Sequence, residues 1–158
     1  MIVNKAYRYR IYPTTAQKMM FAKTFGCVRF IYNKMLSDRI DYYKETGQKL
    51  NNTPAQYKEE FPWLKEVDSL ALANAQLNLN KAYSHFWNDS QHFGKPRFKS
   101  KKNRRASYST NNQKGSVRIE GHKVKLPKVG WVKLCQHRPL PENSIIKTVT
   151  ISQTPSGK

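Results

Sequence analysis

The chain has 158 residues and a formal net charge of +19, because 29 Lys and Arg stand against only 10 Asp and Glu. Its hydrophobic fraction of 38% is low for a globular domain, but together with 12% aromatic residues it is too high for a disordered tail. No uncharged apolar stretch approaches the roughly 18 residues of a membrane span, and two cysteines exclude a disulfide-rich scaffold and a four-cysteine zinc site.

The first part of the chain predicts a strand followed by a long helix. Residues 4–12 alternate basic with aromatic or apolar side chains, which is the period of a β-strand. Thr14 and Gln17 form a capping-box signature, and apolar residues then recur every three or four positions until Gly47. Gly26 interrupts this pattern, so the segment is either one helix with a weak point or two helices.

The middle of the chain predicts a second long helix. Residues 48–67 are mixed in character and contain a short helix near 54–61. Asp68 or Ser69 is placed to cap the next helix, whose wide apolar face indicates burial against another helix. Its end is predicted at the Phe-Gly-Lys-Pro sequence of residues 93–96.

From residue 107 onward the pattern changes to short β-like segments separated by turn signals. These segments predict a small antiparallel barrel or sheet, and the lone N-terminal strand is expected to pair with them. We therefore predict an α+β fold, with residues 1–13 and 95–158 forming the β-barrel and residues 14–94 a helical insertion after the first strand. The predicted strands are 107–110, 116–119, 122–126, 131–134 and 145–152.

The last strand pattern is followed by turn residues but by no returning strand. Pro155, Ser156 and Gly157 have the composition of a hairpin turn, and Lys158 is the last residue. We therefore expect the sequence to be truncated, with a naturally frayed terminus as the alternative.

The positive charge is concentrated in the second part of the chain. Residues 95–158 contain 16 basic and 2 acidic side chains, so most of these cations cannot form internal ion pairs. A dense basic run of this kind binds phosphate with little sequence preference, unless it is only a solvated loop. The cations of the densest run, residues 95–105, are Lys95, Arg97, Lys99, Lys101, Lys102, Arg104 and Arg105.

Aromatic and polar residues accompany these cations. Tyr7, Arg8, Tyr9 and Arg10 alternate in a way that suits stacking on bases with contact to phosphate, although core packing explains the two tyrosines equally well. The stretch 107–113 is rich in hydroxyl and amide groups, which can contact phosphate or base edges; an ordinary polar turn is the alternative.

We predict no catalytic residue, no metal ligand and no cofactor in this chain. Acidic residues are few, and the only ones that share a helix face are best explained as a solvated surface. The histidines lack ligand spacing, and neither cysteine has an activating neighbour. The residues considered were Asp38, Asp41, Glu45, His85, His92, His122, His137, Cys27 and Cys135.

Five segments in this order resemble the N-terminal part of TnpB, the OrfB transposon protein family. The resemblance covers essentially the whole chain. Each segment alone is a weak signal for the family, but the five together in this order are specific for it. The segments are residues 4–13, 25–33, 93–102, 125–131 and 146–152.

The resemblance implies a wedge-like β-barrel with a helical recognition insertion, in a family of RNA-guided DNA endonucleases. The expected partners are a guide RNA and DNA carrying a transposon-adjacent motif, with no membrane, in the prokaryotic cytoplasm near the nucleoid. The family's RuvC-like nuclease domain and four-cysteine zinc element lie downstream of this region. We therefore expect this chain to be no enzyme by itself, with the C-terminal nuclease region missing. Matching positions place nucleic-acid contacts at Arg8, Arg10, Ser69, Ala73, Thr110, Asn111 and Asn112.

Two other functions remain open at this point. The chain is alternatively a stand-alone DNA-binding repressor or a transposition accessory protein, which acts without RNA. A third reading is an enzyme that is completed by another chain or by a site not recognisable in the sequence.

Overall fold

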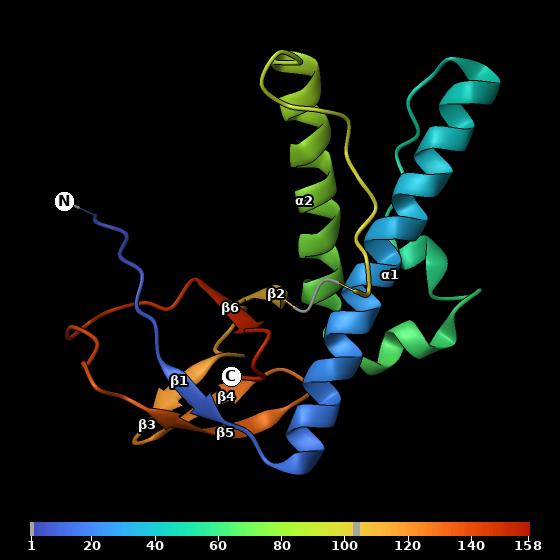
Figure 1. Ribbon diagram of the computed structural model, residues 1–158. Helices are drawn as coiled ribbons and strands as arrows, with labels where there is room; N and C mark the ends of the chain where they lie inside the picture. The colour runs from blue at the N-terminus through green and yellow to red at the C-terminus, as the bar shows by residue number, and fades with distance from the viewer. Residues whose placement is uncertain (1, 103–104) are drawn as a thin grey trace.

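The computed structural model describes residues 2–102 and 105–158. The strands gather at one end of the molecule, and the two long helices rise from them (Figure 1). This order confirms the α+β class and the helices placed after the first strand. In chain order the elements are β1 (Arg10–Tyr12), α1 (Thr15–Thr46), the 3-10 helices η1 (Pro54–Tyr57) and η2 (Pro62–Glu66), α2 (Ser69–Asn88), β2 (Ala106–Asn111), β3 (Arg118–Glu120), β4 (Lys123–Leu126), β5 (Gly130–Cys135) and β6 (Thr148–Gln153).

Helix α1 begins and ends where the sequence predicts. The Thr14 hydroxyl accepts a hydrogen bond from the backbone N–H of Gln17, whose side chain accepts one from the backbone N–H of Thr14. Gly47 ends the helix in the left-handed conformation, with φ of +70°. The helix continues through Gly26, so the alternative of two helices is wrong. Both neighbours of this glycine are buried, and their packing outweighs its penalty of about 1 kcal/mol.

The segment between the two helices differs in detail from the prediction. Two short 3-10 helices, η1 and η2, replace the single short helix expected near residues 54–61. Asp68 caps α2, because its carboxylate accepts a hydrogen bond from the backbone N–H of Leu70 at 3.0 Å. Helix α2 ends at Asn88, earlier than predicted, and the Asp89 carboxylate contacts His92 Nδ1 at 2.7 Å in the turn that follows.

The strands form two antiparallel sheets. One has the order β1-β5-β4-β3 and the other contains β2 and β6, so the predicted pairing of the N-terminal strand with C-terminal strands is confirmed. The predicted barrel is not confirmed, because no ladder joins the two sheets among the described residues. A groove of about 490 Å³ separates β1 from β6, and it is lined by Ile11 and Tyr12 on one side and Ile151 and Gln153 on the other.

One hydrophobic core joins the helices to both sheets. Ile31, Met35 and Leu36 of α1 and Leu72 of α2 are fully buried, and Tyr108 of β2 packs into the same cluster. The sheets therefore pack on the helices through buried apolar side chains. This burial stabilises the fold by about 25 cal/mol per Å² of apolar surface removed from water.

No helix in the part of the chain that the structure describes is both long enough and apolar enough to cross a membrane.

Candidate nucleic-acid interface

The basic run lies on the connection between α2 and β2. This connection comprises residues 89–105, and its described part up to residue 102 passes alongside α1 and α2 (Figure 1). We call it the connecting segment. Arg104 lies outside the residues that the structure describes, so the prediction for it stays a prediction. The other cations of the run, Lys95, Arg97, Lys99, Lys101, Lys102 and Arg105, are exposed.

One side chain of α1 fastens the connecting segment. Asn33 donates a hydrogen bond to the carbonyl of Lys99 at 2.8 Å and accepts one from the Lys99 N–H at 2.7 Å. The Lys99 ammonium lies 4.6 Å from the centre of the Tyr32 ring, and partial burial lowers the pKa of this lysine. Lys99 therefore also serves to attach the segment to α1.

Near the N-terminus the aromatic side chains contact one another and the chain that follows β5. The Tyr7 and Tyr9 rings are stacked, and the Tyr9 hydroxyl donates a hydrogen bond to the carbonyl of Arg138. The Arg138 guanidinium lies 4.2 Å from the centre of the Tyr7 ring. Both tyrosines are half-buried, whereas Arg8 and Arg10 are exposed.

The predicted residues around the start of α2 lie close together, and most of them have internal partners. The Thr110 hydroxyl is fully buried and donates a hydrogen bond to Asp68, the residue that caps α2. Asn111 accepts a hydrogen bond from Asn74 at 2.7 Å, so β2 is tied to α2 twice. The side chain of Thr110 is thus not presented at the surface.

The remaining predicted residues of this group differ in exposure. The Asn112 side chain donates a hydrogen bond to the carbonyl of Ile146 and accepts one from the N–H of Val117. It therefore links the backbone of two segments that are distant from each other in sequence. Ser69 is exposed and Ala73 is half-buried on the first turns of α2.

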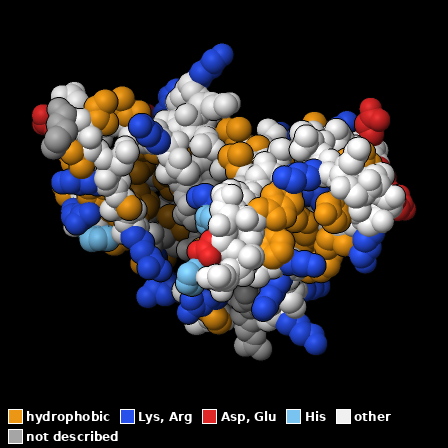
Figure 2. Space-filling model, turned by 90° about the horizontal axis from the view of Figure 1, so that it is seen from above, with side chains coloured by type: hydrophobic (Ala, Val, Ile, Leu, Met, Phe, Trp, Pro, Cys, Tyr) orange, Lys and Arg blue, Asp and Glu red, His pale blue; other side chains and the backbone are white. Residues whose placement is uncertain are grey.

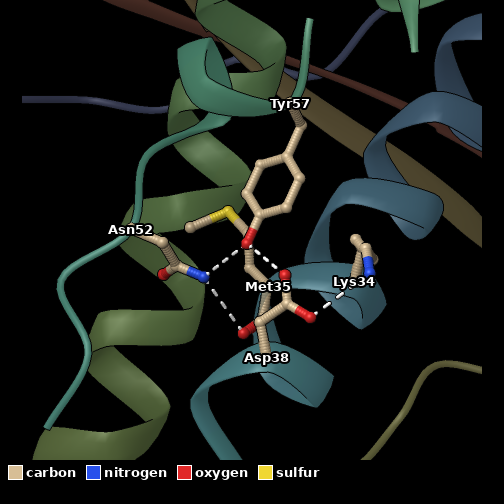
Figure 3. Close-up of polar contacts among 5 residues, drawn as sticks. All are labelled: Lys34, Met35, Asp38, Asn52 and Tyr57. Carbon is tan, nitrogen blue, oxygen red and sulfur yellow. Dashed lines mark hydrogen bonds and ion pairs between the residues drawn. The ribbon is translucent and has the colours of Figure 1, made fainter. Parts of the chain in front are cut away.

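Asp38, an acidic residue of α1, belongs to a structural network of polar side chains. The Tyr57 hydroxyl donates to the Asp38 carboxylate at 2.6 Å and accepts from the amide of Asn52 at 2.8 Å (Figure 3). Asp38 also pairs with Lys34 at 3.3 Å. Burial and the hydrogen bond to Asp38 raise the pKa of Tyr57 to about 12. In the described residues no three His, Cys, Asp or Glu side chains are grouped to hold a metal ion.

Positive charge dominates the surface. Figure 2 shows many Lys and Arg side chains on the face above the helices and few Asp and Glu. Setting Arg105 aside, no Lys or Arg of the described residues after position 94 forms an ion pair. These side chains carry charge that only water or an external anion balances.

Apart from Arg10, the exposed side of the four-stranded sheet consists of surface residues that the sequence reasoning did not select as nucleic-acid contacts. Its core side carries Val124, Val132 and Leu134, while the opposite side carries the alternate residues of the same strands. These alternate residues are exposed, and we call them the outer sheet face: Arg10, Tyr12, Arg118, Glu120, Lys123, Lys125, Trp131, Lys133 and Cys135. The period of two in 123–126 and 131–134 was the signal that would have placed them on one surface.

Comparison with known proteins gives the chain's relatives. A family model described as a helix-turn-helix domain, of the OrfB type, matches residues 1–48. Virulence protein VsdF of Salmonella dublin is 33% identical over 113 residues, which cover 61% of this chain and 93% of that protein. A Streptomyces pristinaespiralis protein with the provisional name RNA-guided DNA endonuclease is 31% identical over 163 residues, and InsQ of Escherichia coli strain K12, named in the same way, is 25% identical over 159 residues.

The chain belongs to the OrfB/TnpB transposon protein family. It spans only 40% and 38% of the lengths of the Streptomyces and Escherichia proteins, while these matches cover 99% and 95% of this chain. The residues matched by the helix-turn-helix model form β1 and the continuous helix α1 in this structure.

Proposed function

We propose that this chain is the nucleic-acid-binding N-terminal part of a TnpB-like protein, which binds a guide RNA and a transposon-adjacent DNA motif. The observation that carries the proposal is the excess of positive charge after residue 94, where 16 basic side chains accompany 2 acidic ones. A surface of this kind binds the phosphate backbone of a nucleic acid. The names of the Streptomyces and Escherichia relatives support RNA and DNA as the partners.

The proposed division of labour follows the two parts of the fold. The strands, with residues 1–13 and 95–158, act as a wedge that holds the guide RNA. The helices of residues 14–94 act as a recognition insertion over the DNA. Catalysis is left to a nuclease region outside this sequence. We propose that Arg8, Arg10, Ser69, Ala73, Asn111, Asn112 and the exposed cations of the connecting segment contact nucleic acid, with Thr110 holding β2 in position beside them.

Co-purification of RNA tests this function. The chain is expressed, bound nucleic acid is extracted and sequenced, and its release is followed against salt concentration. One enriched transcript from beside the gene, retained at moderate salt, is the expected result. A preference for duplex DNA over structured RNA contradicts the guide-RNA function and favours a stand-alone DNA-binding repressor. Magnesium-dependent cleavage by this chain alone contradicts the non-catalytic role.

A cluster variant of the connecting segment tests where the RNA binds. Replacing Lys99, Lys101, Lys102, Arg104 and Arg105 by Ala removes five cations. Affinity for the co-purified RNA should fall, and the slope of log affinity against log salt should flatten by up to about 3.5, or about 0.7 for each lost contact to a single strand. The matched control replaces five cations of the helical part, Lys44, Lys49, Lys58, Lys65 and Lys81. An unchanged slope in the connecting-segment variant means that this run is only a solvated surface.

A further inference from the structure

The outer sheet face is a flat array of cations and aromatic rings whose placement follows from the strand register. On β4 and β5, Lys125 lies opposite Trp131, and Lys123 lies opposite Lys133. On β1, which pairs with the other side of β5, Tyr12 lies opposite Lys133. Same-side residues lie about 6.6 Å apart along a strand and about 4.8 Å apart between strands. The two rings and three lysines therefore form one continuous patch.

Charge on this patch is strongly unbalanced. Arg10 and Arg118 extend the three lysines at its two ends, and Glu120 is the single acidic member. None of these five cations forms an ion pair with any of the residues that the structure describes. The Arg10 guanidinium lies 5.2 Å from the centre of the Tyr12 ring, which keeps a cation beside an aromatic surface.

The two rings are exposed although they are large and apolar. Tyr12 is 48% exposed and Trp131 is 38% exposed. They are diagonal neighbours across β1 and β5, which places their backbones about 7–8 Å apart. A shallow depression of about 290 Å³ between Trp131, Lys123 and Glu120 lies beside the Trp131 ring. The core below is formed by the alternate residues, so packing does not account for either ring.

The backbone under the patch is held rigidly. Gln17, in the first turn of α1, donates a hydrogen bond to the carbonyl of Trp131 at 2.7 Å. Val132, the next residue, is fully buried and anchors β5 in the core. The backbone that carries the rings and cations is thus in place before any ligand arrives, which lowers the entropy cost of binding.

We propose that the outer sheet face is a stacking platform for an unpaired stretch of polynucleotide, with bases on Tyr12 and Trp131 and phosphates on the surrounding lysines and arginines. Aromatic rings interleaved with cations match the alternation of bases and phosphates in a single strand. A duplex hides its base faces within the stack, so it gains nothing from the exposed rings. The inference rests on the proposed function and adds to it a specific site and the unpaired state of the ligand.

Trp131 is the reporter for the direct test. The chain has three tryptophans, and Trp63→Phe with Trp87→Phe leaves Trp131 alone. This variant is titrated with a twelve-residue oligouridine, with the matching oligothymidine, and with a twelve-base-pair duplex. Both single strands should quench Trp131 fluorescence, and the duplex should not. The relative affinities of the two single strands, measured from the same titrations, decide between RNA and DNA as the source of the unpaired segment. Equal quenching by the duplex, or no quenching by either single strand, overturns the platform.

Two sets of variants separate stacking from charge. Tyr12→Ala and Trp131→Ala should each weaken oligouridine binding by about 5- to 150-fold without changing the salt slope. Replacing Lys123, Lys125 and Lys133 by Ala should flatten the slope by about 2. Trp131→Tyr keeps a ring and should retain most of the affinity, which separates a stacking role from a folding defect. Trp87→Ala, which removes an exposed ring from α2, should change nothing.

The outcomes distinguish the two proposals. A chain that retains its co-purified transcript but shows no Trp131 quenching keeps the proposed function and loses the platform. A chain that quenches with oligouridine but carries only heterogeneous nucleic acid keeps the platform and loses the guide-RNA function. A chain that binds no nucleic acid at all overturns both.

Discussion

The strand part and the helical part of this molecule position their functional side chains in opposite ways. On the outer sheet face the backbone ladder places the side chains, because every exposed residue follows from the register of β1, β5, β4 and β3. In the helical part, side chains place the backbone. Asn33 holds the connecting segment at Lys99, and Asn52 with Tyr57 holds the chain that leaves α1.

The two parts also differ in how their positive charge is arranged, because one has more cations per residue and the other has cations at fixed positions. The connecting segment has the higher density, with seven cations in the eleven residues 95–105. The outer sheet face has fewer cations, which lie on β1 and on the three consecutive strands β3, β4 and β5, but a ladder fixes the position of each. We expect the connecting segment to supply salt-dependent affinity for nucleic acid. We expect the outer sheet face to fix the position and orientation of the bound strand.

The largest expected effect comes from two neighbouring residues of β5 that face opposite sides of the sheet. Leu134→Ala removes a side chain that is 4% exposed, so the free energy of unfolding should fall by about 2–5 kcal/mol. Lys133→Ala should change it by no more than about 0.5 kcal/mol and should lower only affinity for nucleic acid. Urea denaturation and RNA titration of both variants check this. Similar losses of stability in the two variants would contradict the assignment of inner and outer sides.

The second effect concerns the polar anchor of the helical part. Tyr57→Phe removes a hydroxyl that bonds to a carboxylate and to a buried amide, which should cost about 1.5–3 kcal/mol at neutral pH. The pKa of Tyr57 is raised to about 12 by burial and by its bond to Asp38. The unfolded chain loses this proton near its ordinary value of 10, so stability present below that pH should decline as pH rises toward 12.

Alkaline unfolding curves measure this second effect. The wild-type chain should lose stability between about pH 10 and pH 12, and Tyr57→Phe should lose less of it over the same interval. Tyr43→Phe, on an exposed tyrosine of α1, is the matched control and should behave as the wild type. Parallel curves for Tyr57→Phe and the wild type would show that this anchor is not titrated on unfolding. Burial also raises the pKa of Tyr108, so part of the alkaline loss should remain in every variant.

Local signals predicted the elements well, whereas contacts between distant residues escaped prediction. The cap at Thr14, the stop at Gly47 and the cap at Asp68 depend on hydrogen bonds within a few residues, and all three were recognisable. The open seam between β1 and β6 and the early end of α2 depend on tertiary packing, which no local pattern encodes.

The candidate site divides in the same way. The basic run was visible as a contiguous string of letters, but Lys99 proved to be partly an attachment point for α1. Apart from Arg10, the outer sheet face was missed, because its residues come from four segments that only the register brings together. Thr110 was selected by matching position, and its burial against Asp68 could not be read from sequence.

The smallest expected effect compares a glycine of the sheet with a glycine of the connecting segment. Gly121 is the first residue of the two-residue turn between β3 and β4, with φ of +58°, a conformation that side chains with a Cβ adopt at a cost. Gly121→Ala should therefore lower the free energy of unfolding by about 1–2 kcal/mol, although no atom lies within 4 Å of the added Cβ. Gly94→Ala also meets open space, and its backbone is not left-handed, so stability should stay level or rise by up to about 1 kcal/mol.

Because steric crowding is absent at both positions, thermal unfolding of the two variants isolates backbone conformation as the cause. A larger loss from Gly94 than from Gly121 would mean that the connecting segment, rather than the sheet, demands the special backbone, and it would reverse the contrast between the two parts.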